Sequence, residues 1–157
     1  MTQAKNISDH VPRLPQLPQI GEQLCFALYS SSLAMNKVYR KRLAPLGVTY
    51  PQYLVLMILW QQDALSVSGI GALLFLDSAT LTPLLKRMET LGLVSRARAT
   101  RDERQVIISL TTAGRALRNK AAALSESVQC ATGCTEAQVI ALNRQLAILR
   151  EALLANA

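Results

Sequence analysis

Apolar residues recur at helical spacing along most of the chain, and the pattern stops where glycine and proline appear. The first such stretch covers residues 17–43 and ends before Pro45 and Gly47, which are the usual helix breakers. Thr49 and Gln52 are spaced as a capping box at the start of the next apolar stretch. The N-terminal part therefore predicts a long helix followed by a short, buried one.

Two more short helices are predicted in the centre of the chain. Ser66 is a suitable N-cap for a helix with one apolar face, and residues 78–91 carry leucine and methionine on one face up to Gly92. A tight turn at residues 75–77 separates them. The spacing thus indicates two helices joined by a turn.

After Gly92 the apolar period changes from helical to alternating. Residues 93–98 and 105–110 are predicted strands, joined by a polar loop at residues 99–104. The pattern therefore predicts a β-hairpin.

Helical spacing returns after the hairpin. A helix is expected to begin at Thr111 or Thr112 and to end before Gly133, and Thr135 with Gln138 forms a second capping box that begins a final helix. Apolar residues in that final helix are spaced as a heptad seam, which needs a partner surface. The seam consists of Val139, Leu142, Leu146, Leu149 and Leu153.

Two short helices followed by a two-stranded ribbon are typical of a winged helix-turn-helix, in which the second helix enters the major groove of DNA. We therefore predict a mainly α fold with a small β-hairpin wing, dimerising through its terminal helices. The winged helix-turn-helix covers about residues 49–110, and the dimerisation helices cover about residues 17–46 and 112–154. Residues 17–157 form a single domain in this interpretation, and residues 1–16 form a flexible arm.

Composition narrows the class of protein further. The longest uncharged apolar run, residues 53–60, is too short for a membrane span, and no signal peptide is recognisable, so we expect a cytoplasmic protein without membrane contact. The net charge of +7 favours a polyanionic partner. The chain has no glycine-rich phosphate loop, no H-E-x-x-H motif and no histidine placed as a general base, so it is not predicted to be an enzyme or to hold a cofactor.

Polar and basic residues gather on the predicted DNA-reading elements. Positions off the leucine face of the second helix suit base edges and phosphates; they are Ser78, Thr80, Thr82, Lys86 and Arg87. The wing adds four arginines, Arg96, Arg98, Arg101 and Arg104. Asp102 and Glu103 offer an alternative in which the arginines form ion pairs on a solvated face, but basic residues on both helix and wing favour DNA.

The three cysteines are Cys25, Cys130 and Cys134, an odd number that does not fit a secreted disulfide framework. Cys25 is followed by Tyr29 and by two further tyrosines, Tyr39 and Tyr50, whose hydroxyls can donate hydrogen bonds to a thiolate. We interpret Cys25 as a candidate redox sensor.

Two alternatives to the sensor remain open at this stage. A cysteine in an apolar helix is often an inert core residue, and tyrosines at helical spacing often only pack. A metal site built from the three cysteines and His10 ranks below redox chemistry, so no metal is predicted.

Short motifs around the wing resemble a known family. Residues 91–94, 101–104 and 108–114 resemble the MarR signature, in which a D-x-R pair lies in the wing and L-T-x-x-G opens the next helix. Residues 76–89, together with the cysteine at position 25 and the tyrosines at 39 and 50, resemble the OhrR group of organic hydroperoxide sensors. The resemblance covers about residues 19–152.

The resemblance implies roles for individual residues. Cys25 would be the peroxidatic thiol, Tyr39 and Tyr50 its hydrogen-bonding partners, and Cys130 the resolving thiol of the two-cysteine type. Asp102 and Arg104 would be the DNA-binding elements of the wing. Arg98 is a further candidate for DNA binding because of its place among the arginines of the hairpin, independently of the resemblance. Whether Cys130 or Cys134 resolves stays open.

Helix geometry adds one constraint on the sensor. Tyr29 shares a helix face with Cys25, but Tyr39 lies fourteen residues further on, roughly 21 Å along the axis at 1.5 Å per residue. A contact between Tyr39 and Cys25 would therefore have to cross between subunits.

The expected function is a homodimeric repressor of a pseudo-palindromic DNA operator, with organic hydroperoxides as inducers. Oxidation of Cys25 and disulfide formation with Cys130 would release the operator. The alternative is a MarR-type regulator that responds to a small aromatic ligand in the dimer cleft.

Overall fold

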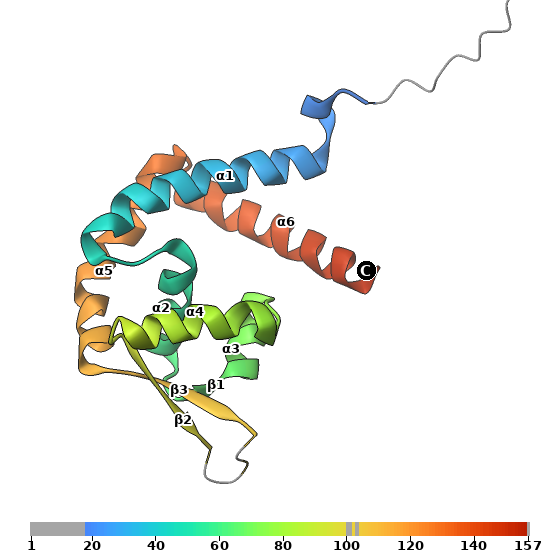
Figure 1. The fold of residues 1–157 in the computed structure, drawn as a ribbon. Coiled ribbons are helices and arrows are strands. Elements are labelled where there is room, and N and C mark those ends of the chain that lie inside the picture. The colour runs from blue at the N-terminus through green and yellow to red at the C-terminus, as the bar shows by residue number, and fades with distance from the viewer. Residues whose placement is uncertain (1–17, 100–101, 103, 157) are drawn as a thin grey trace, which may run out of the picture. The chain divides into compact units, whose positions relative to one another are not determined.

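The computed structural model describes residues 18–99, 102 and 104–156 (Figure 1). The predicted arm, residues 1–16, lies outside the described residues. By their contacts the described residues fall into two compact units, which are divided between Ala34 and Met35, inside one continuous helix. In chain order the elements are η1 (Ile20–Glu22), α1 (Leu24–Leu43), η2 (Ala44–Leu46), α2 (Tyr50–Gln61), β1 (Leu65–Ser66), α3 (Val67–Leu74), α4 (Ser78–Thr90), β2 (Val94–Arg98), β3 (Val106–Leu110), α5 (Thr112–Thr132) and α6 (Glu136–Ala155).

The predicted helix starts in the centre of the chain are confirmed by their caps. The side chain of Gln52 accepts a hydrogen bond from the Thr49 amide at 2.8 Å, as a capping box requires. The Ser66 hydroxyl accepts the Gly69 amide at 3.0 Å at the start of α3. These caps satisfy backbone donors that would otherwise be left open in the first helical turn.

The turn between α3 and α4 is tightly built. Phe75 has φ 56, a left-handed conformation that costs a non-glycine residue roughly 1–2 kcal/mol. The Leu76 amide donates to the Gly71 carbonyl at 3.0 Å, and a Cβ on Gly71 would lie 2.7 Å from the Leu76 carbonyl oxygen. Glycine at position 71 therefore permits the close approach of α3 to the turn.

The wing belongs to a sheet of three antiparallel strands in the order β1-β3-β2. The predicted hairpin is confirmed, with Val94 opposite Leu110 and Arg98 opposite Val106, and it extends beyond the helices α2 to α4 (Figure 1). The expectation of only two strands was incomplete, because Leu65 of β1 also pairs with β3. A two-residue strand is too short to give an alternating pattern.

The core of the second unit holds α4 against its neighbours. Apolar side chains from α2, α3, α4 and β3 are completely buried there, and burial stabilises each by about 1.5–3 kcal/mol. They include Val55, Leu56, Ile70, Leu81, Leu85, Met88 and Ile108. Because the buried residues of α4 all lie on one face, the other face of this helix is left for a partner.

A carboxylate holds the base of the wing. Asp63 follows α2 and accepts hydrogen bonds from the Ala64 amide at 2.8 Å, the Leu110 amide at 2.9 Å and the Arg115 guanidinium at 2.5 Å. Arg115 also donates to the Leu110 carbonyl at 3.0 Å. Burial alone would raise the pKa of Asp63, but the hydrogen bonds outweigh burial and hold this pKa below its ordinary value. Asp63 therefore joins the end of α2 to the end of β3 and the first turn of α5.

Replacing Asp63 with Asn should lower the free energy of unfolding at pH 7 by about 1–2 kcal/mol, because the ionised partner of Arg115 is lost. A lowered pKa stabilises the fold above the pKa of the unfolded carboxyl, about 3.9, and this contribution is lost as pH falls through the folded-state pKa. Urea unfolding at pH 7 and at pH 3 measures the loss of stability in Asp63→Asn and its dependence on pH. The control is Glu151→Gln in an exposed pair, and a difference from wild type that stays equal at the two pH values would contradict the assignment.

The last helix, α6, has no buried residue. Several of its apolar side chains are largely exposed, including Ile148 at 63% and Leu153 at 59%. Its Arg150 lies over the ring of Phe75, 4.4 Å from the centroid. Three residues of the predicted seam are exposed in the single chain, Leu142, Leu146 and Leu153, while Val139 and Leu149 are half-buried. The packing of the seam in a dimer stays a prediction.

No single helix among the described residues is long and apolar enough to cross a membrane; two bent helix pairs pass such a test only by combined length and composition.

Candidate functional site

Helix α4 carries the polar residues that were predicted to contact DNA. Ser78, Thr80, Lys86 and Arg87 are exposed, and Thr82 is half-buried with its hydroxyl donating to the Ser78 carbonyl at 2.6 Å. The helix is capped by a carboxylate, that of Asp77, which accepts the Thr80 amide at 2.6 Å. This hydrogen bond is the main reason that the pKa of Asp77 is lowered. Four of the five positions predicted to contact DNA are therefore exposed, and their contact with DNA stays a prediction.

The wing presents arginines beyond the sheet. Arg98 is exposed, and the Arg104 side chain is 91% exposed while its Nε and its amide both donate to Asp102 at 3.1 Å. Hydrogen bonds from the Arg104 side chain, then from its amide, lower the pKa of Asp102 against the effect of desolvation. Asp102 thus orients Arg104, whereas a carboxylate facing a phosphate would repel it. Arg101 and Glu103 lie outside the described residues.

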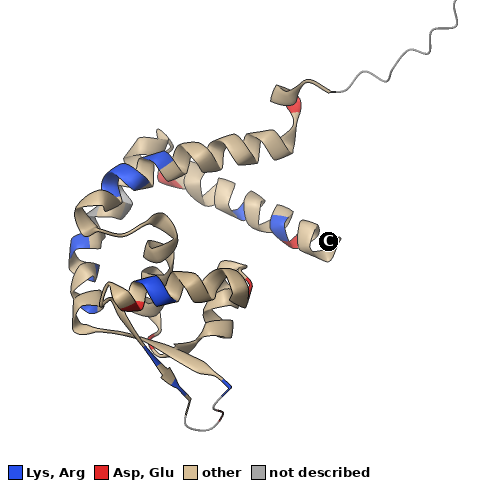
Figure 2. Ribbon diagram, in the orientation of Figure 1, with Lys and Arg blue, Asp and Glu red and all other residues tan. Residues whose placement is uncertain are grey.

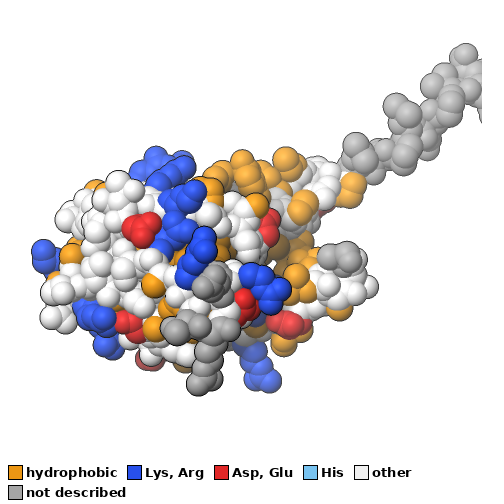
Figure 3. All heavy atoms as spheres, turned by 60° about the horizontal axis from the view of Figure 1, so that its bottom comes forward, with side chains coloured by type: hydrophobic (Ala, Val, Ile, Leu, Met, Phe, Trp, Pro, Cys, Tyr) orange, Lys and Arg blue, Asp and Glu red, His pale blue; other side chains and the backbone are white. Residues whose placement is uncertain are grey.

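Basic residues lie on α4 and on the hairpin (Figure 2). Figure 3 shows Lys and Arg side chains spread over the face that the tilted view brings forward. Such a surface favours a polyanion, in agreement with the net charge of +7.

Cys25, in the N-terminal unit, is the second residue of α1 and is exposed. Its Sγ lies 3.7 Å from Oε1 of Gln23. Tyr29 follows one turn later and is 61% exposed. Cys25 is thus accessible in the single chain, and its role as a redox sensor stays a prediction.

Tyr39 and Tyr50, in the second unit, stack with ring centroids 4.3 Å apart, and Tyr53 lies 6.0 Å from Tyr39. Burial, and then the neighbouring phenols, raises the pKa of Tyr39 and of Tyr50, so both hydroxyls remain protonated donors at neutral pH. Neither hydroxyl has a hydrogen-bond partner within the part of the chain that the structure describes. The two predicted partners of the thiolate therefore come together as a pair of available donors, and their contact with Cys25 stays a prediction.

The two distal cysteines differ in accessibility. Cys130 is exposed in the last turn of α5, whereas Cys134 is half-buried between α5 and α6, with its Sγ 3.6 Å from the Thr132 carbonyl. All three cysteines are free thiols. The described residues contain no group of three His, Cys, Asp or Glu side chains arranged for a metal ion, and His10 lies outside them. A zinc site therefore has no support in the described residues.

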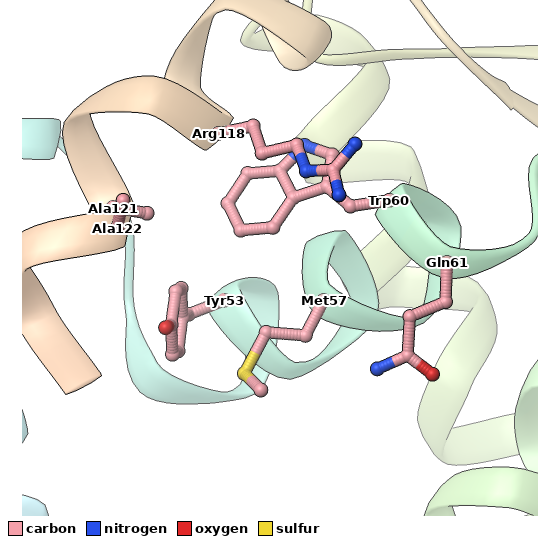
Figure 4. Close-up of a pocket in the computed structure, with 7 residues that line it drawn as sticks. All are labelled: Tyr53, Met57, Trp60, Gln61, Arg118, Ala121 and Ala122. Carbon is pink, nitrogen blue, oxygen red and sulfur yellow. The ribbon is translucent and has the colours of Figure 1, made fainter.

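The sequence patterns did not point to a cleft of about 230 Å³ between α2 and α5. Tyr53, Met57 and Trp60 line it from α2, and Arg118 reaches it from α5 (Figure 4). Trp60 Nε1 donates to the Gly114 carbonyl at 3.0 Å, which holds the indole against α5. The spacing of residues gave no signal for it, because Arg118 is one of three basic residues on α5, with Arg115 and Lys120.

Residues 35–121 match the model of the transcriptional regulator SarA/Rot family. The regulator TtmR of Methylorubrum extorquens is 51% identical over 138 residues, which cover 88% of this chain and 71% of the relative. The organic hydroperoxide resistance transcriptional regulator of Bacillus subtilis is 52% identical over 103 residues, 66% of this chain and 70% of the relative.

AbfR of Staphylococcus epidermidis is similar in structure. Its reduced form bound to DNA has a TM-score of 0.72 and 36% identity, covering 86% of this chain and 94% of AbfR. Its disulfide form has a TM-score of 0.60 and 38% identity, covering 83% and 91%. These relatives confirm the predicted winged-helix fold and a regulatory role rather than an enzymatic one. The chain therefore belongs to the SarA/Rot family of transcriptional regulators, winged-helix proteins of the MarR type.

Proposed function

We propose that this regulator is a homodimeric repressor that releases its operator when an organic hydroperoxide oxidises Cys25. The observation that carries the proposal is the exposed thiol of Cys25 in the first turn of α1, where a hydroperoxide in solution can reach it. Two relatives support it by name: one is a hydroperoxide resistance regulator, and the other has been captured with a disulfide.

The oxidation proceeds in two steps. The Cys25 thiolate attacks the terminal oxygen of the hydroperoxide, the O–O bond breaks, and the alkoxide takes a proton and leaves as an alcohol. Cys25 is then a sulfenic acid. The thiol of Cys130 attacks its sulfur, a disulfide forms, and water is released.

The tyrosine pair supplies the hydrogen-bond donors for this chemistry. Tyr39 belongs to the same continuous helix as Cys25, fourteen residues away, so the Tyr39 that approaches Cys25 comes from the partner subunit. The Tyr39 and Tyr50 hydroxyls stabilise the thiolate and the leaving alkoxide, and Tyr29 stands one turn from the thiol on its own helix.

The dimer is supported by the apolar residues that α6 leaves exposed, since an apolar seam without a partner is costly in water. In that dimer each α4 enters the major groove, and two half-sites lie about 34 Å apart on a pseudo-palindromic operator. The wing arginines bind the adjacent backbone or minor groove.

The test is a titration of operator binding, with a duplex selected from random DNA by the reduced protein. Cumene hydroperoxide should abolish binding by wild type, a thiol reductant should restore it, and Cys25→Ser should stay bound throughout. The matched control is cumyl alcohol, which has the same shape but no O–O bond. Release by the alcohol as well as by the hydroperoxide would overturn the redox mechanism.

A second candidate function is the response to a small aromatic acid. The cleft between α2 and α5 favours it, because Trp60 and Tyr53 offer aromatic surfaces and Arg118 forms no ion pair within the described residues. Benzoate is the probe: release of the operator by benzoate from the Cys25→Ser protein, with loss of this effect in Arg118→Met, would support ligand control.

A further inference from the structure

A second cavity, of about 330 Å³, lies between the wing and the two helices of the helix-turn-helix. Its lining combines the apolar side chains of Val67 and Val106 with polar side chains from α3, α4 and the wing. The polar side chains are those of Ser66 and Ser68 at the start of α3, Ser78 and Thr82 of α4, and Arg96, Arg104 and Gln105 of the wing.

The hydroxyls at the cavity leave donors for an acceptor. Ser66 Oγ accepts the Gly69 amide at 3.0 Å and shares one hydrogen bond of 3.1 Å with Ser68 Oγ, so one of these two O–H groups remains free to donate. Ser78 is the first residue of α4 and is exposed. The N-terminal ends of α3 and α4 both lie at this cavity, and their dipoles favour an anion there.

One N–H group of Arg96, that of its Nε, has no acceptor among the described residues. Its side chain is only 21% exposed, its Nη1 pairs with Glu89 at the long distance of 3.4 Å, and its buried Nε has no hydrogen-bond partner. A buried N–H without an acceptor is costly, and such a group requires an explanation. The Arg96 guanidinium lines the cavity and is matched there only by the long contact to Glu89, so an anion in the cavity would accept from its terminal N–H groups.

The position of the cavity identifies the anion. Ser78 and Thr82 line it from α4, which faces the DNA in the proposed function, and Arg104 lines it from the wing. When a recognition helix occupies the major groove, the wing reaches the backbone beside that groove. A group between helix and wing is therefore a backbone phosphate.

We propose that this cavity holds one phosphodiester of each operator half-site, bound by Arg96 together with the hydroxyls of Ser68 and Ser78. This contact rests on the DNA-binding part of the proposed function and is independent of its redox part. It positions the wing and α4 on the same phosphate, which sets the register of the helix in the groove without reading a base.

The experiment uses the selected operator with a single uncharged methylphosphonate placed at each backbone position in turn. One position per half-site should cost wild type about tenfold in affinity beyond its neighbours. In Arg96→Met, which keeps the aliphatic stem, affinity should fall by a similar factor, the salt slope should drop by about 1 per subunit, and the methylphosphonate at that position should cost nothing further.

Arg98→Met is the matched control, because Arg98 is on the same strand but does not line the cavity. This variant should retain the penalty at the sensitive position. Ser68→Ala, a conservative surface change on α3, should also reduce that penalty. Because Ser68 is not part of the wing, this variant tests the site even if Arg96→Met distorts the wing. If every methylphosphonate lowered the affinity of Arg96→Met by the same factor as that of wild type, the two effects would be independent, and the proposed site would be wrong. Failure of the reduced wild type to bind any duplex would overturn the proposed function itself.

Discussion

Stoichiometric cumene hydroperoxide is expected to convert the reduced protein, a monomer on a denaturing gel, into a disulfide-linked dimer through Cys25 and Cys130 of different subunits. Both thiols are exposed, and both lie on terminal helices that are predicted to pack at the dimer interface. A disulfide requires Cα atoms within about 7 Å, so resting thiols that close would risk premature bridging. We therefore expect them to be well separated in the reduced dimer.

Three variants read out the pairing by non-reducing electrophoresis. Cys25→Ser and Cys130→Ser should stay monomeric, whereas Cys134→Ser should still form the cross-linked band, because Cys134 is half-buried. A band that survives Cys130→Ser and is lost in Cys134→Ser would transfer the resolving role to Cys134. If wild type stays monomeric on the gel while it loses its affinity for DNA, the disulfide between subunits is wrong.

The cross-link would act on DNA through the spacing of the winged units. Bringing Cys25 and Cys130 together must move the helices that carry them, and half-sites about 34 Å apart tolerate little change in the separation of the two α4 helices. The loss of affinity should therefore follow the appearance of the dimer band in the same titration.

Gly114→Ala should be the most destabilising single substitution that we predict in the second unit. A Cβ at position 114 would overlap the carbonyl oxygen of Leu93, and both groups are backbone or fixed to backbone. The surroundings cannot yield easily, because the Gly114 amide donates to Thr111 and its carbonyl accepts from Trp60, each at 3.0 Å. We expect a loss of about 3 kcal/mol in the free energy of unfolding.

Thermal and urea unfolding measure this effect. Gly21→Ala is the matched control, since a Cβ at Gly21 would meet no atom within 4 Å. Equal midpoints for Gly114→Ala and wild type would show that α5 can shift away from Leu93, and they would contradict the steric argument.

The elements themselves could be predicted from the sequence because their signals are local. Helix caps depend on residues two or three positions apart, as at Thr49 with Gln52 and at Thr135 with Gln138. The wing could be predicted from the change of apolar period after Gly92. The buried face of α4 could be predicted in the same way from its leucine spacing, whereas the contact of its other residues with DNA stays a prediction.

Only the tertiary structure decided which distant residues meet. Asp63 bonds to Leu110 and Arg115, 47 and 52 residues further along the chain, and Trp60 bonds to a carbonyl 54 residues away. Three other features cannot be predicted from the spacing of apolar and polar residues. They are the two-residue strand β1, the stacking of Tyr39 on Tyr50 and the unpaired Nε of Arg96. Such contacts depend on how whole elements pack, whereas caps and periodicity report only the conformation of neighbouring residues.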